Sequence, residues 1–381
     1  MKVVIAIDSF KGSLSTFASA EAVKEGIHAV DASAEVEICP LADGGEGTVA
    51  AVVGATGGTL STVTVTGPLG EKVSAEYGVI PASKTAVIEM AAAAGITLVP
   101  AHLRDPLLTT TYGVGELILH AIRENGCRNF LIGIGGSATN DGGVGMLRAL
   151  GFRFLDAEGK DIPHGACGLD LLKKIDIKGV LPELKDCKFE IACDVKNPLC
   201  GKNGCSAVYG PQKGATPETV KSMDAALSAY ADLTAQTLGR ADAEYPGAGA
   251  AGGMGFAFLS YLNADLVSGI ELVMRVTHLE EKLKDADLVV TGEGRLDAQS
   301  CMGKAPVGVA RAAKKYGKPV IAFCGCASED ASLCNQNGID AFFPILQTPC
   351  TVAAAMDLPT AHFNLKTTAE QVFRLITSMR R

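Results

Sequence analysis

The sequence lacks any cluster of basic residues apart from the terminal Arg380–Arg381 pair, and its formal net charge is −8. Proteins that bind nucleic acid or anionic membranes usually carry a basic face, so we expect neither partner. No apolar segment reaches the roughly 18 uncharged residues that span a bilayer. The N-terminal run MKVVIAIDSFKGS meets Asp8 early and has no small-residue cleavage site, so it predicts a first strand rather than a signal peptide. We therefore expect a cytoplasmic protein.

Several catalytic motifs are missing as well. No Gly-Lys pair is followed by Ser or Thr, which excludes the P-loop pattern. There is no H-E-x-x-H and no G-x-S-x-G, which argues against a metalloprotease and a Ser-His-Asp hydrolase. The twelve cysteines are few for 381 residues, and several lie in apolar runs without a second pair at zinc-finger spacing. They predict reduced, buried thiols rather than disulfides or a metal-thiolate site.

What the chain does contain is an alternation of short apolar runs with amphipathic segments. Its length favours two domains, and 48% hydrophobic with 20% charged residues indicates a globular protein. The pattern predicts an α/β fold with a largely parallel sheet. Ser15 or Thr16 is the expected N-cap of the first helix. We expect strands at 2–8, 35–42, 287–294, 319–325 and 339–345, helices at 15–30, 45–56 and 304–317, and a terminal helix to Arg380.

Residues 61–80 interrupt this pattern. Two alternating runs flank Gly67-Pro68-Leu69-Gly70, which predicts an antiparallel hairpin. A parallel domain does not normally contain one. We therefore expect a discontinuous Rossmann- or flavodoxin-like parallel-sheet domain from residues 1–60 and 286–381, with a mixed-sheet α/β domain, 61–285, inserted. A cleft between two such domains is the usual place for a small-molecule site.

The segment FLIGIGGSATNDGGVGMLRALG, residues 130–151, carries the strongest local signal. A strand that enters a glycine turn and then a helix offers free N–H groups and the positive end of a helix dipole, so it favours binding of phosphate or carboxylate. Two alternatives stay open. The turn could be purely structural, or Gly133, Gly135 and Ala138 could form a G-x-G-x-x-A motif for NAD(P), with Asp156 at the expected acidic offset.

Polar residues recur at other predicted strand-to-helix turns. Each has an alternative: Lys11 could be a solvated loop lysine, Asp43 a helix N-cap, and Asp194 a turn residue. A fold needs glycine turns, but it does not need charged side chains beside each one, so their recurrence favours a ligand site. Phosphoryl transfer is the leading reaction for such a site, because it depends mainly on positioning and on neutralising charge. The clusters are DSFKGS with Asp8, Ser9 and Lys11, PLADGGEG with Asp43, ACDVKN with Asp194, YGPQKGATPE with Lys213, PGAGAAGGMG, and TGEGRLD with Glu293, Arg295 and Asp297.

Taken together, these blocks resemble the bacterial glycerate kinase family. DSFKGSLS, PLADGGEGT, VTGPLG, AVIEMAAAAG, GIGGSATNDGGVGMLRALG, ACDVKNPLCG, YGPQKGATPE, PGAGAAGGMG and TGEGRLD stand in order between Asp8 and Asp297. The resemblance implies two α/β domains, one inserted in the other. It also implies phosphorylation of D-glycerate by ATP with Mg²⁺, giving 2-phosphoglycerate in sugar-acid or glycolate catabolism. A 3-phosphoglycerate product, an NAD(P)-dependent hydroxy-acid oxidoreductase and a non-catalytic metabolite sensor are the alternatives.

Residue roles are hypotheses drawn from this chemistry. Arg295 suits the substrate carboxylate because a guanidinium binds it bidentately, and Lys11 could serve there or neutralise the transferred phosphoryl group. Asp194 is the expected base. The remaining candidates are Asp8 and Ser9 for the substrate, Gly135, Gly136, Ser137, Asn140 and Asp141 for the nucleotide, and Asp43 and Glu293 for Mg²⁺. We expect a monomer or homodimer.

Overall fold

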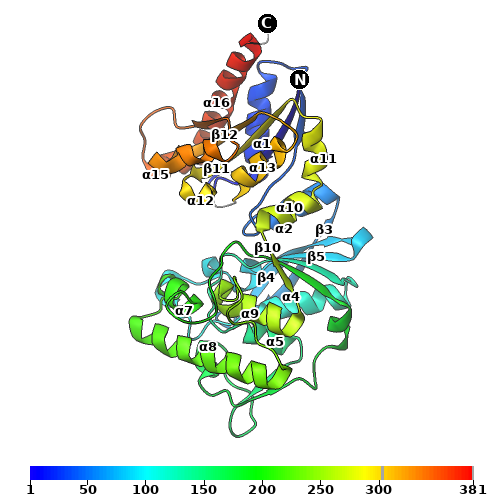
Figure 1. The fold of residues 1–381 in the computed structure, drawn as a ribbon, viewed down its shortest axis with the longest axis vertical. Helices are drawn as coiled ribbons and strands as arrows, with labels where there is room; N and C mark the ends of the chain where they lie inside the picture. The colour runs from blue at the N-terminus through cyan, green and yellow to red at the C-terminus, as the bar shows by residue number, and fades with distance from the viewer. Residues whose placement is uncertain (302–303, 380–381) are drawn as a thin grey trace. The chain divides into compact units, whose positions relative to one another are not determined.

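The computed structural model describes residues 1–301 and 304–379, and its contacts divide the chain into two compact units (Figure 1). Unit 1 comprises Met1–Asp43, Ala50–Thr56 and Ile270–Arg381, so it is built from both chain ends. Unit 2 comprises Gly44–Val49 and Gly57–Gly269. Residues 270–284, which the sequence pattern assigned to the insertion, form helices within unit 1. No helix in the described ranges combines the length and the apolar character needed to cross a membrane.

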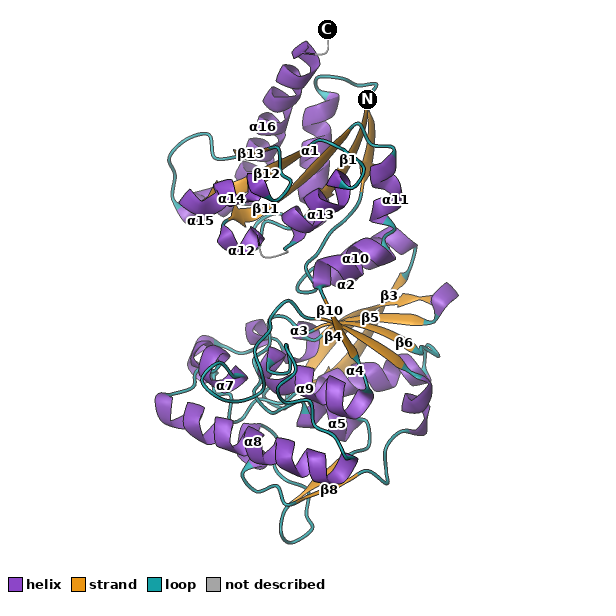
Figure 2. Cartoon of the chain, viewed as in Figure 1, coloured by secondary structure: helices purple, strands orange, loops and turns teal. Residues whose placement is uncertain are grey.

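Unit 1 is organised around a five-stranded parallel sheet in the order β13-β12-β11-β1-β2. Its three central strands, β12, β11 and β1, carry consecutive buried residues and are therefore buried on both faces. Helices cover the sheet (Figure 2). The elements are β1 (Lys2–Ile7), α1 (Thr16–His28), β2 (Glu35–Ile38), α2 (Thr48–Thr56), α10 (Gly269–Val276), α11 (Leu279–Lys284), β11 (Leu288–Leu296), α12 (Ala298–Cys301), α13 (Ala305–Lys314), β12 (Val320–Ala327), α14 (Leu333–Gln336), β13 (Ala341–Pro344), α15 (Val352–Met356) and α16 (Leu358–Met379).

The core of unit 1 joins one face of the sheet to α1 and α16, because alternate strand residues such as Val3, Ile5 and Ile7 pack with apolar residues of both helices. Ser15 is the N-cap of α1, and its hydroxyl accepts the amide of Ala18. The terminal helix follows the prediction to Met379; Arg380 lies outside the described residues.

Unit 2 contains a six-stranded mixed sheet in the order β10-β9-β6-β5-β4-β3 and a separate antiparallel pair, β7-β8. Strands β10, β9, β6 and β5 run parallel, and β4 and β3 complete the sheet as an antiparallel hairpin. The elements are β3 (Thr59–Thr66), β4 (Lys72–Ile80), β5 (Thr85–Glu89), α3 (Ala91–Ala94), α4 (Tyr112–Arg123), β6 (Asn129–Gly133), α5 (Val144–Ala149), β7 (Arg153–Leu155), α6 (Ala166–Leu169), β8 (Lys174–Asp176), β9 (Lys188–Ala192), α7 (Cys205–Tyr209), α8 (Pro217–Leu238), α9 (Ala250–Leu262) and β10 (Asp265–Val267).

The hairpin turns where the sequence predicts it. Gly67 donates its amide to the carbonyl of Glu71 at 2.6 Å, and Gly70 donates to Gly67 at 3.1 Å. Thr66 then pairs with Lys72 across the turn. A parallel sheet in one unit and a mixed sheet in the other confirm the predicted fold class of two α/β domains.

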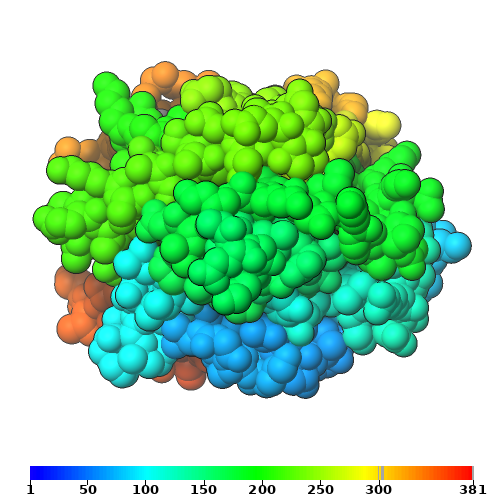
Figure 3. Space-filling model, turned by 90° about the horizontal axis from the view of Figure 1, so that it is seen from below, coloured from blue at the N-terminus to red at the C-terminus, as the bar shows by residue number. Residues whose placement is uncertain are grey.

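Two glycine-rich segments of unit 2 pack backbone against backbone. Gly252 has a φ of +67°, and a Cβ built on it would lie 2.0 Å from the carbonyl oxygen of Thr139. Its own carbonyl accepts the amide of Gly142 at 2.9 Å. Residues 250–253 therefore pack against the loop after β6 and support it. The surface of this middle part of the chain is coloured green in the space-filling view (Figure 3).

This contact predicts a strong and local effect of Gly252→Ala. The new methyl group needs a left-handed backbone and overlaps the Thr139 carbonyl, so we expect the free energy of unfolding to fall by about 1–3 kcal/mol beyond the backbone cost alone. Urea denaturation followed by circular dichroism measures it.

Gly159→Ala is the matched control, because Gly159 also has a positive φ, +79°, but nothing lies within 4 Å of its Cβ position. The control isolates the backbone cost, on the order of 1 kcal/mol. Equal losses in the two variants would mean that the close packing of Gly252 is unimportant.

Candidate active site

The carboxyl edge of the unit 1 sheet collects acidic side chains. All five strands are parallel, so their carboxyl ends lie along one edge. Ile7 of β1 is in register with Gly292 of β11, and the amide of Asp8 donates to the Gly292 carbonyl at 2.9 Å. Asp8, directly after β1, and Glu293, on β11, therefore lie at the same level of neighbouring strands, at the edge where open α/β sheets bind ligands.

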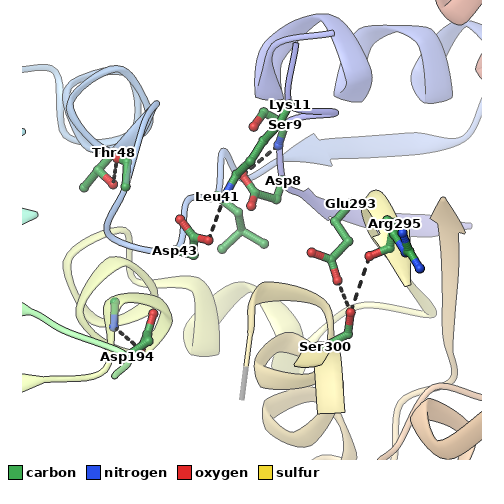
Figure 4. A network of polar contacts seen from close by, with 12 residues as sticks. Asp8, Ser9, Lys11, Leu41, Asp43, Thr48, Asp194, Glu293, Arg295 and Ser300 are labelled. Atoms are coloured by element: carbon green, nitrogen blue, oxygen red, sulfur yellow. Dashed lines mark hydrogen bonds and ion pairs between the residues drawn. The ribbon is translucent and has the colours of Figure 1, made fainter. Parts of the chain in front are cut away.

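Lys11 and Asp43 join this edge from the loops after β1 and β2. Lys11 Nζ donates to Asp43 Oδ2 at 3.0 Å, and the amide of Ser9 donates to Asp8 Oδ1 at 2.7 Å (Figure 4). The Lys11 side chain is 58% exposed, whereas that of Asp43 is 17% exposed. The structure thus brings together Asp8, Ser9, Lys11 and Asp43, which the sequence analysis selected from two separate motifs.

Glu293 and Arg295 both lie on β11, but they have different partners. Ser300 of α12 donates its hydroxyl to Glu293 Oε1 (Figure 4). Arg295 is 65% exposed, and its Nε lies 3.6 Å from Asp297 Oδ2. Ser300 was not among the predicted residues, because its distance in sequence from Glu293 gives no sign that the two side chains meet. An exposed guanidinium beside one carboxylate is suited to capture a small anion.

Three neighbouring carboxylates, those of Asp8, Asp43 and Glu293, determine the electrostatics of this edge. Asp8 is only 2% exposed, and burial, followed by repulsion from Asp43 and Glu293, raises its pKa to about 7. The pKa of Glu293 is also raised by burial, although the Ser300 hydrogen bond opposes the change. The Lys11 ammonium favours the charged form of Asp8 but does not outweigh these effects. The edge therefore has an excess of negative charge that an added cation would relieve.

The donor set is compatible with Mg²⁺. Asp8, Asp43 and Glu293 offer only carboxylate oxygens, and Mg²⁺ prefers oxygen ligands, usually with one or two protein carboxylates and several waters. Among residues 1–301 and 304–379, however, no group of three or more Asp, Glu, His or Cys side chains forms a ready-made metal site. Asp43 and Glu293 as magnesium ligands remain a prediction.

In unit 2, the loop after β6 presents its backbone to solvent over a short stretch. Gly135 and Gly136 are exposed, whereas residues 137–143 are buried. Gly136 has a φ of +74°, and Ser137 forms an isolated antiparallel bridge with Gly95. Within the described residues, no protein acceptor receives the amides of Gly135, Gly136 or Ser137. Adjacent unpaired amides of this kind suit an anion.

Asn140 and Asp141 lie deeper and bind protein groups. Asp141 Oδ2 accepts the amide of Thr111 at 2.9 Å, its hydroxyl at 2.8 Å and the amide of Gly145 at 3.2 Å. Its Oδ1 accepts the amide of Gly143 at 3.1 Å. Asn140 donates to Ser206 Oγ at 2.9 Å. These contacts hold the start of α5, so both residues shape the loop, and their predicted contact with a nucleotide stays untested.

Asp194 follows β9 at the same edge of the sheet as this loop. Gly133 of β6 is in register with Ala192 of β9, so the loop and Asp194 continue from neighbouring parallel strands. The amide of Gly269 donates to Asp194 Oδ1 at 3.0 Å, and Asp194 is exposed. The structure therefore groups Asp194 with the glycine loop in unit 2, and Asp8, Lys11, Asp43, Glu293 and Arg295 in unit 1.

Two residues of unit 2 have roles that sequence patterns did not indicate. Glu89, at the end of β5, accepts the amide of Val49 at 2.8 Å. It therefore caps the first turn of α2, whose Thr48 and Val49 belong to unit 2, and this is the task that the alternative interpretation gave to Asp43. Lys213 was noted between glycines without a role, and the structure buries it beneath the glycine loop.

The NAD(P) hypothesis for the loop is wrong. It needs an acidic residue on the strand next to β6 in the parallel sheet. Asp156 instead follows β7, which pairs antiparallel with β8 in a separate two-stranded sheet. Its carboxylate accepts the amides of Glu158 and Lys160 within its own turn. The acidic offset was a coincidence of spacing, because Asp156 lies in a local turn outside the main sheet.

Comparisons with known proteins agree over nearly the whole chain. Residues 3–377 match the family described as "Glycerate kinase family". The chain is 52% identical over 355 residues to "Glycerate 2-kinase" of Escherichia coli, which covers 93% of both chains. It is 50% identical over 376 residues to "Glycerate kinase" of Haemophilus influenzae, which covers 99% of both. A crystal structure of a "putative glycerate kinase 2" from Salmonella typhimurium LT2 is 49% identical with a TM-score of 0.90, and covers 100% of this chain and 99% of that one.

The raised pKa of Asp8 predicts a pH-dependent effect of Asp8→Asn. The folded protein holds the Asp8 proton up to about pH 7, whereas the unfolded chain releases it near the ordinary value of 3.8. Between these values the folded state binds more protons, so wild-type stability falls as pH rises. Asn removes this loss. We expect Asp8→Asn to gain stability relative to wild type between pH 4 and pH 8, by on the order of a few kcal/mol.

Thermal unfolding of the ligand-free protein at pH 4, 6 and 8 measures the difference. Asp285→Asn is the control, since it removes an exposed carboxylate of the same unit. A pH-independent difference between Asp8→Asn and wild type would refute the assigned electrostatics.

Proposed function

Since the chain belongs to the glycerate kinase family, we propose that it transfers the terminal phosphoryl group of ATP to the 2-hydroxyl of D-glycerate. The products are 2-phosphoglycerate and ADP. The observation that carries the proposal lies in unit 2, where the unpaired amides of Gly135 and Gly136 and the carboxylate of Asp194 follow neighbouring parallel strands. A phosphate-binding loop and a base then share one sheet edge. The similarity to the "Glycerate 2-kinase" of E. coli supports the 2-position.

The phosphate chain of ATP would bind the loop through the amides of Gly135, Gly136 and Ser137. These donors are fixed by the fold, so they need no rearrangement as negative charge shifts during transfer. The exposed guanidinium of Arg295 would bind the glycerate carboxylate bidentately. Lys11, with Asp8 and Ser9 beside it, would hold the substrate or neutralise the phosphoryl group in flight.

Asp194 would act as the base. Its Oδ1 accepts the amide of Gly269 at 3.0 Å, and this contact restrains the carboxylate, which supports the proposed role. As the hydroxyl oxygen of glycerate forms its bond to the terminal phosphorus, the proton passes to Asp194. The bond from that phosphorus to the bridging oxygen breaks, and its electron pair leaves with ADP.

Asp43 and Glu293 would hold Mg²⁺, in part through water, at the carboxylate-rich edge of unit 1. A bound magnesium ion neutralises phosphate oxygens and thereby favours both nucleotide binding and the departure of ADP. The excess negative charge around Asp8 supports this assignment. We also propose that the enzyme is cytoplasmic, because ATP is available there as the phosphoryl donor. The proposed assembly is a monomer or a homodimer.

The product of ATP and D-glycerate tests the proposal directly. In a proton-coupled ³¹P spectrum, a 2-phosphate couples to the single C2 proton and gives a doublet, whereas a 3-phosphate couples to the C3 methylene and gives a triplet. We expect ADP and a new doublet in equal amounts. Incubations without D-glycerate, and with L-glycerate, are the controls.

A triplet would show that the product is 3-phosphoglycerate, and the proposed 2-kinase activity would be wrong. ADP that accumulates with free phosphate and no ester would reject glycerate as the acceptor. Nucleotide binding with no ADP at all would favour a sensor over an enzyme.

Asp194→Asn should lower kcat by at least about 100-fold, because general-base catalysis usually contributes that much. The KM for ATP should change little, since Asp194 would act on the attacking hydroxyl and not on the nucleotide. Initial rates from a coupled ADP assay provide both values.

Asp265→Asn is the matched control. Asp265 is an exposed aspartate of the same sheet, and it begins β10, where it is in register with Glu190 of β9. A loss in kcat of less than about tenfold for Asp194→Asn, equivalent to about 1.4 kcal/mol of barrier, would remove Asp194 from the role of base.

A further inference from the structure

Lys213 is a fully enclosed cation directly beneath the glycine loop. It ends a short helical turn, Pro211–Lys213, and is only 2% exposed. Its Nζ donates to Ser137 Oγ at 2.8 Å and to the carbonyl oxygen of Thr139 at 2.6 Å. Both acceptors belong to the segment that follows the exposed Gly135–Gly136 turn. One ammonium therefore holds the loop at two points from the side opposite to solvent.

The charge on Lys213 is poorly compensated. Among the described ion pairs, none includes Lys213, although a buried charge normally requires a partner. The titratable groups that face it are Cys205 of α7 and Asp141 of the loop. Burial raises the pKa of the Cys205 thiol to about 11, so that group is neutral. Asp141 already accepts hydrogen bonds from Thr111, Gly143 and Gly145.

The interior around the ammonium is polar and incompletely paired. Thr139 Oγ1 and Asn140 Oδ1 are both buried and have no hydrogen-bond partner in the described structure. Burial lowers the pKa of Lys213 to about 8, and the negative charge of Asp141 opposes this change only in part. A fold that needed only a hydrogen-bond donor here would avoid this cost with a neutral side chain. An anion bound on the outer side of the loop would offset the cost of burying the Lys213 ammonium, because the two charges attract each other.

We propose that Lys213 is a positioning residue that sets both the shape and the positive potential of the Gly135–Ser137 loop for the phosphate chain of a nucleotide. It acts through Ser137 and Thr139 and does not touch the ligand. This inference rests on the proposed function, because it takes the loop to be the phosphate site. Phosphate at the outer amides and the proton on Lys213 then stabilise each other, since the buried ammonium interacts with the anion through a medium of low dielectric.

A reciprocal coupling follows from this arrangement. If the protonated form of Lys213 favours nucleotide binding, then binding raises the pKa of Lys213, and the protein takes up protons when nucleotide binds near pH 8.5. Nucleotide affinity should fall by up to about tenfold per pH unit above pH 8. A lysine that served only as a hydrogen-bonded clamp would give neither effect.

Isothermal titration of the full-length protein with a non-hydrolysable ATP analogue tests the coupling. The titration is run at pH 8.5 with Mg²⁺ in two buffers of different ionisation enthalpy, so that the difference in heat counts the protons exchanged. We expect wild type to take up a substantial fraction of one proton for each nucleotide bound. Lys213→Met keeps the length of the side chain without the charge; it should abolish this uptake and weaken binding at pH 7 by at least tenfold.

Steady-state kinetics add a second readout. In Lys213→Met the KM for ATP should rise and lose its dependence on pH, while the KM for D-glycerate stays within about twofold of wild type. Lys221→Met is the matched control, because Lys221 is exposed on α8 in the same unit, and it should behave as wild type. Ser137→Ala, which removes one contact but keeps the charge, should retain the proton uptake.

The proposal is overturned if wild type takes up no proton and its nucleotide affinity is constant from pH 7 to pH 9.5. It is also overturned if Lys213→Met and Lys221→Met give the same affinity. The wild-type measurement alone decides the matter if Lys213→Met does not fold. Failure of the proposed function is recognised separately, because wild type would then form no phosphoglycerate, or would bind no nucleotide at all.

Discussion

The arrangement of unit 2 depends on the close approach of one peptide backbone to another around the loop after β6. A Cβ on Gly133 would lie 2.0 Å from the carbonyl oxygen of Gly44, and a Cβ on Gly252 would lie 2.0 Å from that of Thr139. Only glycine permits such contacts on both sides. Because the loop is fixed by its neighbours at both places, the two glycines between them, Gly135 and Gly136, remain exposed with their amides unpaired.

Much of this organisation could be predicted from the sequence, because it follows from periodicity and from the special properties of glycine. The apolar runs of β1 and β11 predict buried parallel strands, and parallel strands bring their carboxyl ends to one edge. This geometric rule placed Asp8 near Glu293, although 285 residues separate them. The hairpin around Gly67–Gly70 likewise follows from local turn chemistry. Such inferences succeed because they require no knowledge of which side chain meets which.

The features that escaped prediction depend on side-chain contacts that the periodicity of the sequence does not specify. Asp141 belongs to the same glycine-rich motif as the exposed Gly135 and Gly136, yet Thr111 and two loop amides enclose its carboxylate. Glu89 lies in an apolar run and caps α2 through the amide of Val49. Ser300 has no motif of its own, but it meets Glu293. In each case the residue type was visible and its burial was not, because burial is decided by the packing of elements that the sequence pattern cannot place.

Both units contain titratable groups whose ordinary charge is disfavoured by burial, and Asp8 and Lys213 are an example from each. Burial and neighbouring carboxylates raise the pKa of Asp8 to about 7, and burial lowers the pKa of Lys213 to about 8. Both groups therefore cost the ligand-free protein stability near neutral pH, with opposite signs of charge. A cation beside Asp8 and an anion on the loop above Lys213 would each restore ordinary ionisation. Side chains with strongly shifted pKa values are common at ligand-binding sites. If ligands bind near these two residues as proposed, the stability that the ligand-free protein loses there would be recovered as binding affinity.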